Sequence, residues 1–275
     1  MKFSGQFIGK FIVRLLRASH LAPTLLVTFI AYLLAQQLWP LPAALLIALA
    51  IFTGQLCVGW SNDLVDLSSD RAQQRRNKPL ATGELSKNAA EAATFIALAL
   101  TTFLSLLGPL SLRGGLLHLL GVGSGVAYNF YFKKRWLSPL PYLIAFAALP
   151  SCIVLSKNST VPLWLILVGA LLGLAAHFSN VVKDMEEDQA AGIMGAPQLL
   201  GTRWSLLIAG TSLISVSIIL SRVTQQRFLI PAAIVAFIAL LALPKKFTFP
   251  LIMAMALLDV ALFLSAGTAT LLLPS

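Results

Sequence analysis

Long apolar runs are the feature that most restricts the fold of this chain. Beyond the first twenty residues, hydrophobic stretches of about 16 to 25 residues follow one another, separated by short polar segments. A helix needs about 20 apolar residues to cross the hydrocarbon core of a bilayer. Only 11% of the residues are charged, against about 25% in a soluble domain. We therefore expect an all-α, polytopic membrane protein that forms a single domain over residues 1–275.

Nine transmembrane helices in one bundle are predicted. They are Leu21–Trp39, Pro42–Trp60, Ala89–Gly108, Leu116–Phe132, Leu137–Ser156, Val161–Val182, Ser205–Leu220, Phe228–Leu243 and Phe249–Leu273. Residues 1–20 read as an amphipathic helix, because Phe3, Phe7 and Phe11 fall four apart and basic residues fall on another side. Such a helix is expected to lie in the membrane interface and not to be a signal peptide.

The distribution of basic residues predicts the orientation. With the N-terminus in the cytoplasm, 16 of the 20 Lys and Arg residues fall in cytoplasmic segments, as is usual for membrane proteins. This bias accounts for the net charge of +10 without nucleic acid, so no nucleic-acid partner is expected. We expect an integral protein of the cell (inner) membrane, in contact with membrane lipid, with its C-terminus outside.

Acidic residues are concentrated in two segments that repeat one another. Residues 61–70 and 179–188 both follow the pattern Ser-Asn-x-x-x-Asp-x-x-x-Asp, at an offset of 118 residues. The same offset pairs Gly83 with Gly201. We infer an internal repeat in which each half places one aspartate-rich motif at the cytoplasmic end of a span.

The spacing within each motif indicates a metal site. Residues four apart share one face of a helix, and carboxylates on that face repel each other unless a cation lies between them. Carboxylate and amide oxygens without His or Cys suit Mg²⁺, which commonly shares its coordination sphere with a substrate phosphate. The alternative is that these are solvated carboxylates paired with Arg and Lys of the loops, and the duplication disfavours it.

Polar and basic side chains near both motifs suggest a diphosphate as the ligand. A metal and cationic side chains together bind a diphosphate and stabilise it as a leaving group. Positive-inside topology alone explains part of the basic residues. The residues predicted to bind substrate are Arg71, Lys78, Lys133, Lys134, His177, Asn180 and Lys183.

Over essentially the whole chain, these residues resemble the UbiA superfamily of intramembrane prenyltransferases. Residues 62–71 look like the first aspartate-rich motif of that family, 77–83 like the stretch after it, and 184–192 like the second motif. Residues 128–142 are similar to the family's loop between its fourth and fifth helices. Residues 194–196 depart from the Thr-Leu that relatives often have there, which leaves the subfamily open.

The resemblance implies a mechanism. Mg²⁺ bound by both motifs would hold an isoprenoid diphosphate, and loss of the diphosphate would leave an allylic cation that a hydrophobic acceptor captures. The leading interpretation is thus a Mg²⁺-dependent prenyltransferase acting on a hydrophobic, aromatic acceptor. The implied metal ligands are Asn62, Asp66, Asp70, Asp184 and Asp188. The implied catalytic residues are Asp66, Asp184 and Tyr128, the last near the allylic carbon.

Two other functions stay open at this point. A terpene cyclase of the same superfamily would ionise the diphosphate and quench the cation within the prenyl chain, so its product would form without an acceptor. A transporter would fit intramembrane acids and inverted repeats. It is disfavoured because an even number of spans separates the two motifs, which makes the repeat parallel.

A few isolated polar residues remain. Asp259 lies inside the ninth predicted span, and acids in a membrane face the bundle interior or a cavity, so we expect it to line the acceptor pocket or a packed interior. Arg17 and His20 are placed to reach either the diphosphate or lipid headgroups. Cys57 and Cys152 lie in apolar runs and are predicted to be buried packing residues.

Overall fold

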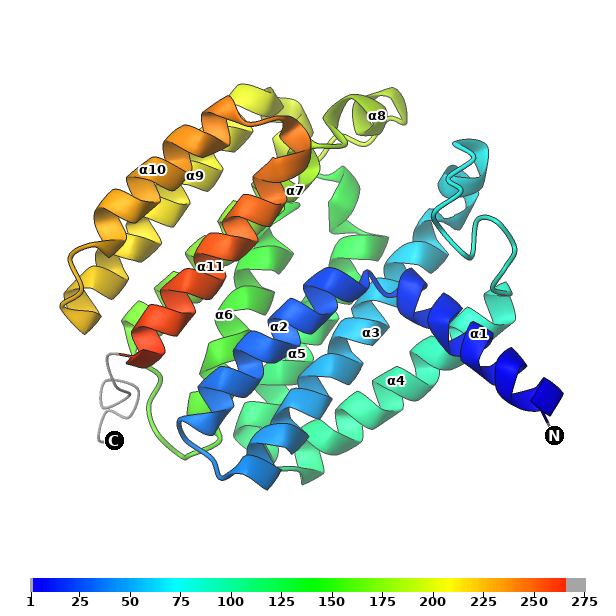
Figure 1. Ribbon diagram of the computed structural model, residues 1–275, viewed down its shortest axis with the longest axis horizontal. Coiled ribbons are helices and arrows are strands. Elements are labelled where there is room, and N and C mark those ends of the chain that lie inside the picture. The colour runs from blue at the N-terminus through cyan, green and yellow to red at the C-terminus, as the bar shows by residue number, and fades with distance from the viewer. Residues whose placement is uncertain (1, 266–275) are drawn as a thin grey trace.

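The computed structural model describes residues 2–265, which form a bundle of helices (Figure 1). The α-helices are α1 (Lys2–Ala18), α2 (Leu21–Gln36), α3 (Leu41–Ala72), α4 (Lys87–Leu107), α5 (Ser111–Phe130), α6 (Pro139–Leu155), α7 (Leu163–Val182), α8 (Met185–Ala190), α9 (Ala196–Thr224), α10 (Leu229–Ala242) and α11 (Thr248–Ser265). Two 3₁₀ turns, η1 (Phe132–Lys134) and η2 (Lys245–Phe247), precede α6 and α11. The all-α prediction is confirmed for the described residues.

The apolar helices make the chain an integral membrane protein. By length and composition, five helices of the described part are able to cross a membrane, or six if residues 8–18 and Leu21–Gln36 count as one bent span. Helices α6 and α10, with 17 and 14 residues, are apolar but shorter. Each predicted span coincides with a helix, but nine crossings and their orientation stay predictions. The end of the ninth predicted span, 266–273, lies outside the described residues.

The offset of the two acidic motifs also separates equivalent helices. Helices α2 and α6 begin at Leu21 and Pro139, and α5 and α10 begin at Ser111 and Leu229, which are 118 residues apart in both cases. Gly83 and Gly201 both have a φ of 79°, a backbone conformation that glycine adopts without strain. The two halves therefore share helix starts as well as a turn after each motif.

Helix α1 leaves the bundle at an angle (Figure 1). Its axis over residues 8–18 is bent by 79° from that of α2. One side of α1 packs against α3, where the indole of Trp60 donates a hydrogen bond to the carbonyl of Leu15 at 2.8 Å. Ile8, Ile12 and Val13 are exposed on α1. These apolar side chains fit the predicted interfacial position, which remains a prediction.

Small residues bring α6 and α7 into close contact. Gly169 and Gly173 lie one turn apart on α7, and a Cβ on either would collide with the carbonyl oxygen of Phe146 or Tyr142 on α6. Close backbone approach through small residues is a common way to pack helices in membranes. The contact fixes the N-terminal half of α6 against α7, next to the second motif.

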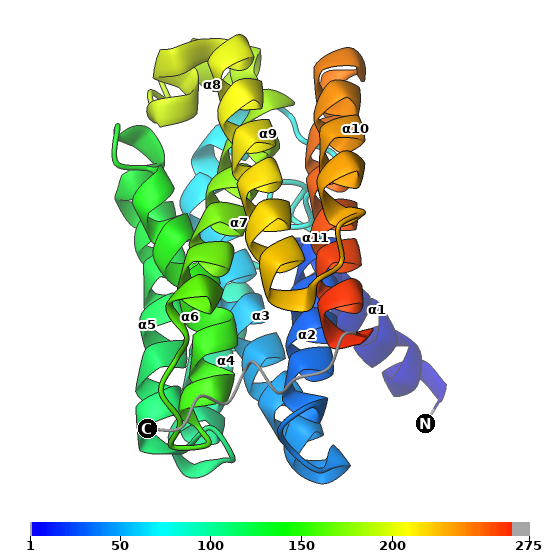
Figure 2. The ribbon, with the colours of Figure 1, turned by 90° about the vertical axis from the view of Figure 1, so that its left-hand side faces the viewer.

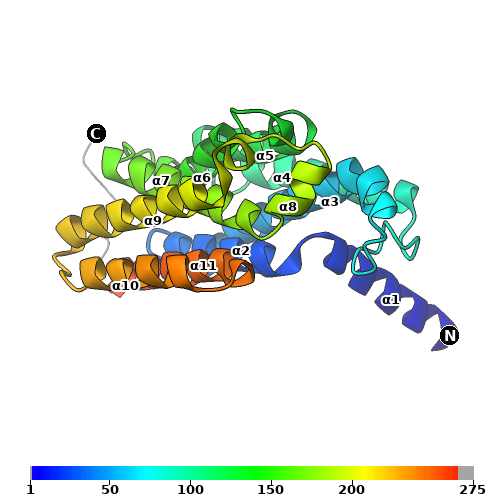
Figure 3. The same cartoon turned by 90° about the horizontal axis from the view of Figure 1, so that it is seen from above.

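The arrangement of the helices gathers both motifs at one end. Helix α8 and the loop after α3 lie at the same end of the bundle (Figures 1 and 2). Figure 3 shows α10, α11 and α2 side by side along one face, with α9, α7 and α6 behind them. The apolar interior thus lies beneath the acidic end.

Cys57 and Cys152 are both buried and free, as predicted.

Candidate active site

The first motif lies on the last turns of α3, which continues past the predicted end at Trp60 to Ala72. Asn129 of α5 holds this helix in place, since its amide donates to the carbonyl of Val58 at 3.0 Å and to the hydroxyl of Ser61 at 2.9 Å. With α3 continuous, the predicted sharing of one helical face holds for the first motif.

The same expectation is wrong for the second motif. Helix α7 ends at Val182, Asp184 adopts φ −107° and ψ 9°, and Asp188 belongs to the separate helix α8. A continuous helix would place four carboxylates at the negative C-terminal end of its dipole. Starting a new helix instead puts Glu186, Glu187 and Asp188 in its first turn, where the dipole favours negative charge.

Lys78 neutralises the most buried part of the first motif. Its ammonium nitrogen lies 2.9 Å from Oδ1 of Asp63 and 2.9 Å from Oδ2 of Asp70. Burial by itself would lower the pKa of Lys78, but the two carboxylates outweigh it and raise the pKa above its usual value. Lys78 therefore stays charged and ties the loop after α3 to the helix. It was predicted as a diphosphate ligand, and here it binds the motif itself.

Asp63 is a site residue that the sequence pattern missed. It is buried, and besides Lys78 it contacts Nε2 of His20 at 3.3 Å. His20 also lies 3.3 Å from the side-chain nitrogen of Asn62. The four-residue spacing of the motif skips Asp63, and its position next to Asn62 was the only available signal. Thus His20 reaches the first motif, whereas Arg17 turns away and pairs with Glu84 at 3.5 Å.

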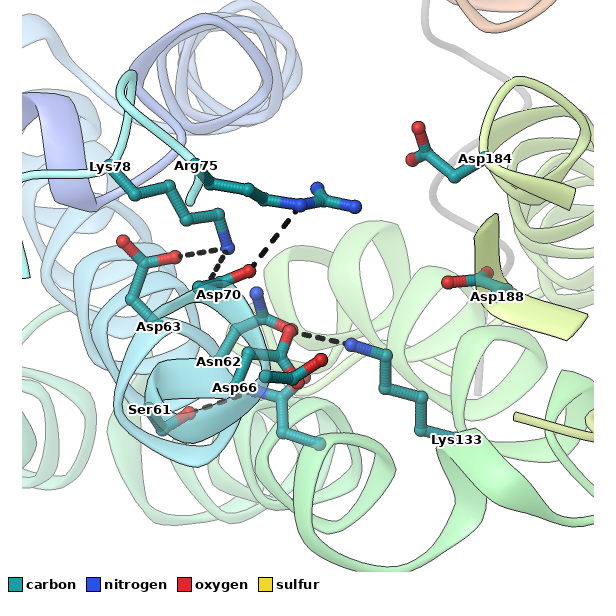
Figure 4. Close-up of polar contacts among 12 residues, drawn as sticks. Ser61, Asn62, Asp63, Asp66, Asp70, Arg75, Lys78, Lys133, Asp184 and Asp188 are labelled. Carbon is teal, nitrogen blue, oxygen red and sulfur yellow. Dashed lines mark hydrogen bonds and ion pairs between the residues drawn. The ribbon is translucent and has the colours of Figure 1, made fainter. Parts of the chain in front are cut away.

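Two further cations lie between the two motifs (Figure 4). Lys133 lies 2.6 Å from Oδ2 of Asp66. Arg75 lies 3.6 Å from Oδ1 of Asp70 and 2.9 Å from Oε2 of Glu187 on α8. Arg75 therefore bridges the two halves of the site, a role that its sequence position did not reveal.

The second motif faces the first from the opposite side (Figure 4). Asp188 accepts a hydrogen bond from Nε2 of Gln198 at 2.8 Å. Burial raises the pKa of Asp188, and this hydrogen bond opposes the increase only in part. Asp184 is half-exposed, with Lys183 no closer than 3.9 Å. Gln198 is another contact that the sequence pattern did not indicate.

Aromatic side chains gather beside the second motif. The ring of Tyr142 lies 5.1 Å from that of Tyr128 and 4.7 Å from that of His177, between ring centroids. Tyr128 and His177 are 5.5 Å apart, so the fold brings these two predicted residues together. Nε2 of His177 lies 3.0 Å from the hydroxyl of Ser138, which fixes the ring. Asn180, also predicted, lies on α7 three residues after His177.

Two predicted substrate ligands lie apart from this arrangement. Arg71 and Lys134 are exposed, and neither forms an ion pair within the described part of the chain. Arg71 lines a polar cavity of about 290 Å³ together with Arg75 and Arg76, beside Asp70. Their assignment as diphosphate ligands stays a prediction.

The donor chemistry fits a hard divalent cation. Among the described residues, no three His, Cys, Asp or Glu side chains lie close enough together to form a metal cage by themselves. The oxygens of the two motifs instead lie on opposite sides, each partly neutralised by Lys or Arg. Mg²⁺ commonly takes one or two protein carboxylates and completes its sphere with water and substrate phosphate. The residues present therefore fit Mg²⁺ bound together with a phosphate-bearing ligand.

The structure thus defines a membrane-embedded helical protein with two opposed acidic motifs at one end. The sequence model of the UbiA prenyltransferase family matches residues 24–267, and the chain belongs to this family. No curated protein matches the chain significantly in sequence.

Solved structures of UbiA homologues share the fold. One from Archaeoglobus fulgidus, bound to GPP and Mg²⁺, has a TM-score of 0.73 at 17% identity, covering 92% of this chain and 99% of that one. A homologue from Aeropyrum pernix K1 has a TM-score of 0.71 at 19% identity, covering 88% and 96%. A digeranylgeranylglyceryl phosphate synthase has a TM-score of 0.64 at 19% identity, covering 93% and 96%. At such identities the likeness establishes the fold alone.

Proposed function

We propose that the protein transfers an isoprenoid group from its diphosphate to a hydrophobic, aromatic acceptor within the membrane, with Mg²⁺ as cofactor. The observation that carries this proposal is that the two motifs face each other at one end of the bundle, with Arg75 and Lys133 between them (Figure 4). Family membership and the homologues solved with GPP or DMAPP and Mg²⁺ support it.

The residues proposed to hold the metal come from both halves. They are Asn62, Asp66, Asp70, Asp184 and Asp188. Bound there, Mg²⁺ would neutralise charge on the diphosphate and so assist its departure. In this structure the ammonium nitrogen of Lys133 lies 2.6 Å from Oδ2 of Asp66 and forms an ion pair with it. With Asp66 bound to the metal, the ammonium group of Lys133 would be free to contact a diphosphate oxygen.

The environment beside the motifs suits a short-lived cation. The rings of Tyr128, Tyr142 and His177 form one cluster, and an aromatic face attracts a cation by its negative quadrupole. The interior beneath is apolar, which keeps water from the cation. We assign Tyr128 to the allylic carbon and His177 to the positioning of Tyr142.

Product analysis tests this function. The purified protein in detergent is given geranyl diphosphate and Mg²⁺, with and without a panel of aromatic acceptors, and the products are identified by mass spectrometry. We expect a prenylated acceptor, formed only when the acceptor is present. A hydrocarbon or terpene alcohol from the diphosphate alone would assign a cyclase instead.

Two variants test the site in the same assay. Asp66→Ala and Asp184→Ala should each abolish turnover while the protein stays folded, because Asp184 is half-exposed and Asp66 contributes one ion pair, with Lys133, to a bundle held together by apolar packing. Glu91→Ala is the control, because Glu91 is an exposed acid on α4 whose ion pair, within the described residues, is with Lys87 at 3.4 Å. Full activity of either aspartate variant would contradict the assignment.

A further inference from the structure

A cavity inside the bundle is linked to the aromatic cluster through one shared neighbour, Phe146. It has a volume of about 80 Å³ and lies among α2, α6, α7, α9 and α11. Phe146 lines it, and the ring of Phe146 stacks on that of Tyr142 at 6.1 Å. A water molecule needs about 10–15 Å³ of such space. The cavity therefore has room for a group of several non-hydrogen atoms, such as the end of a larger ligand.

One carboxyl group interrupts this apolar lining. Among the described residues that line the cavity, Asp259 is the only one with an ionisable side chain. Its side chain is fully buried. Oδ1 accepts a long hydrogen bond of 3.4 Å from the hydroxyl of Ser217. Oδ2 has no hydrogen-bond partner within the described part of the chain.

An unpaired buried oxygen is costly and requires an explanation. Buried polar atoms are almost always hydrogen-bonded, and acids inside membrane bundles commonly serve a ligand or an ion. A hydrogen bond between helices α9 and α11 would explain why Oδ1 is buried, because Oδ1 accepts from Ser217. It leaves Oδ2 unexplained, and this oxygen belongs to a side chain that lines an apolar cavity.

We propose that Asp259 binds a hydroxyl group on the acceptor, at the end remote from the carbon that is prenylated. A hydroxyl is the matching group because it donates to Oδ2 of a charged carboxylate and accepts from Oδ2 of a protonated carboxyl group. The isoprenoid diphosphate does not fit this position, since its tail is a hydrocarbon and has no group to hydrogen-bond with Oδ2. Asp259 lies eleven residues along α11 from Thr248, about 16 Å from the motif end, so the acceptor is elongated. The inference rests on the proposed function, because it names that acceptor.

A binding experiment with two molecules of the same shape tests this inference. The probes are 4-methylphenol and p-xylene, which differ by a hydroxyl in place of a methyl group. They are titrated into the full-length protein in detergent without Mg²⁺ or diphosphate. Trp164 lines the cavity, so the fluorescence change that is lost in Trp164→Phe reports occupancy. The ratio of the two dissociation constants is compared between variants, which cancels partition into micelles.

The wild type should favour 4-methylphenol about three- to tenfold more than Asp259→Leu does, which is the range for one buried hydrogen bond. Asp259→Asn retains an acceptor oxygen and should keep most of the preference. Asp259→Leu removes the acceptor of the Ser217 hydroxyl and leaves that buried group unpaired, which is itself destabilising. The double variant Asp259→Leu, Ser217→Ala removes both polar groups and therefore serves as a second test.

An unchanged ratio in the folded leucine variants would overturn the inference and leave Asp259 as a helix-packing residue bound to Ser217. This outcome is separable from failure of the proposed function. The titration needs no catalysis, so prenyl transfer by the wild type together with an unchanged ratio overturns only the role of Asp259.

Discussion

Carboxylates of the first motif lie close together at the end of α3, and basic side chains offset their repulsion. The cluster of Asp63, Lys78 and Asp70 is the most buried part, with side chains 3%, 12% and 7% exposed. In such surroundings the loss of one partner leaves an uncompensated buried charge, which is more costly than the loss of an exposed ion pair. Lys78 is therefore both a structural residue and a candidate ligand for the diphosphate.

Replacing Lys78 by Met should destabilise the metal-free protein by about 3–5 kcal/mol, because Asp63 and Asp70 lose their shared cation. Lys87→Met is the matched control, since Lys87 and Glu91 form an exposed pair worth less than about 1 kcal/mol. Thermal unfolding in detergent measures both. Equal decreases of the melting temperature in the two variants would show that the buried cluster stabilises the fold no more than the exposed Lys87–Glu91 pair.

The same cluster predicts a dependence on alkaline pH. Because folding raises the pKa of Lys78, its stabilisation is complete below the ordinary lysine value of 10.5 and is lost as the pH rises through the raised pKa. The stability difference between wild type and Lys78→Met should therefore be constant near neutral pH and shrink above about pH 11. Melting curves across this range measure it, and a difference that persists unchanged would argue against a charged Lys78.

The adjacent lysines of η1 provide a matched pair for the diphosphate site. Lys133 contacts Asp66 at 2.6 Å, whereas Lys134 is exposed and forms no ion pair among the described residues. Lys133→Ala should weaken the apparent affinity for geranyl diphosphate about tenfold, the loss of one charge-assisted hydrogen bond. Lys134→Ala should change it less than twofold. Equal effects would mean that both lysines act only through overall charge.

At the level of helices, the sequence predicted those features that depend on the spacing of residues along the chain. The apolar runs, the two motifs and the helices that carry them follow from spacing along the chain, and so does the shared face of Asp66 and Asp70. The break between α7 and α8 did not follow, because it depends on the balance of helix dipoles and on Met185 packing into the interior. The contacts of Asp63 and Arg75 depend on loops that bring distant residues together, so the four-residue pattern missed them.

The contact between α6 and α7 offers a prediction for an element. Gly173→Ala should destabilise the fold by about 1–3 kcal/mol, because its Cβ would overlap the carbonyl of Tyr142. Gly123→Ala is the control, since a Cβ there meets nothing within 4 Å, and it should be neutral or stabilising by about 0.5–1 kcal/mol. If both changes behave alike in thermal unfolding, close packing does not hold α6 against α7.

For the whole molecule, the predicted orientation places the acidic end in the cytoplasm. Labelling of single cysteines checks it in a background where Cys57 and Cys152 are replaced by Ala. Lys134→Cys, exposed beside the motifs, should react only from the cytoplasmic side, and Arg113→Cys, exposed at the start of α5, only from outside. Reaction of both from one side would contradict the predicted topology.

The central claim is that two motifs from the two halves form one site for Mg²⁺ and diphosphate. The most direct measurement is the melting temperature with Mg²⁺ alone, with geranyl thiolodiphosphate alone and with both. Ligands that bind only the folded state stabilise it, and Mg²⁺ binds best when phosphate oxygens complete its sphere. We expect the joint shift to exceed the sum of the separate shifts, and Asp184→Ala to lose the excess. Additive or absent shifts would contradict a shared site.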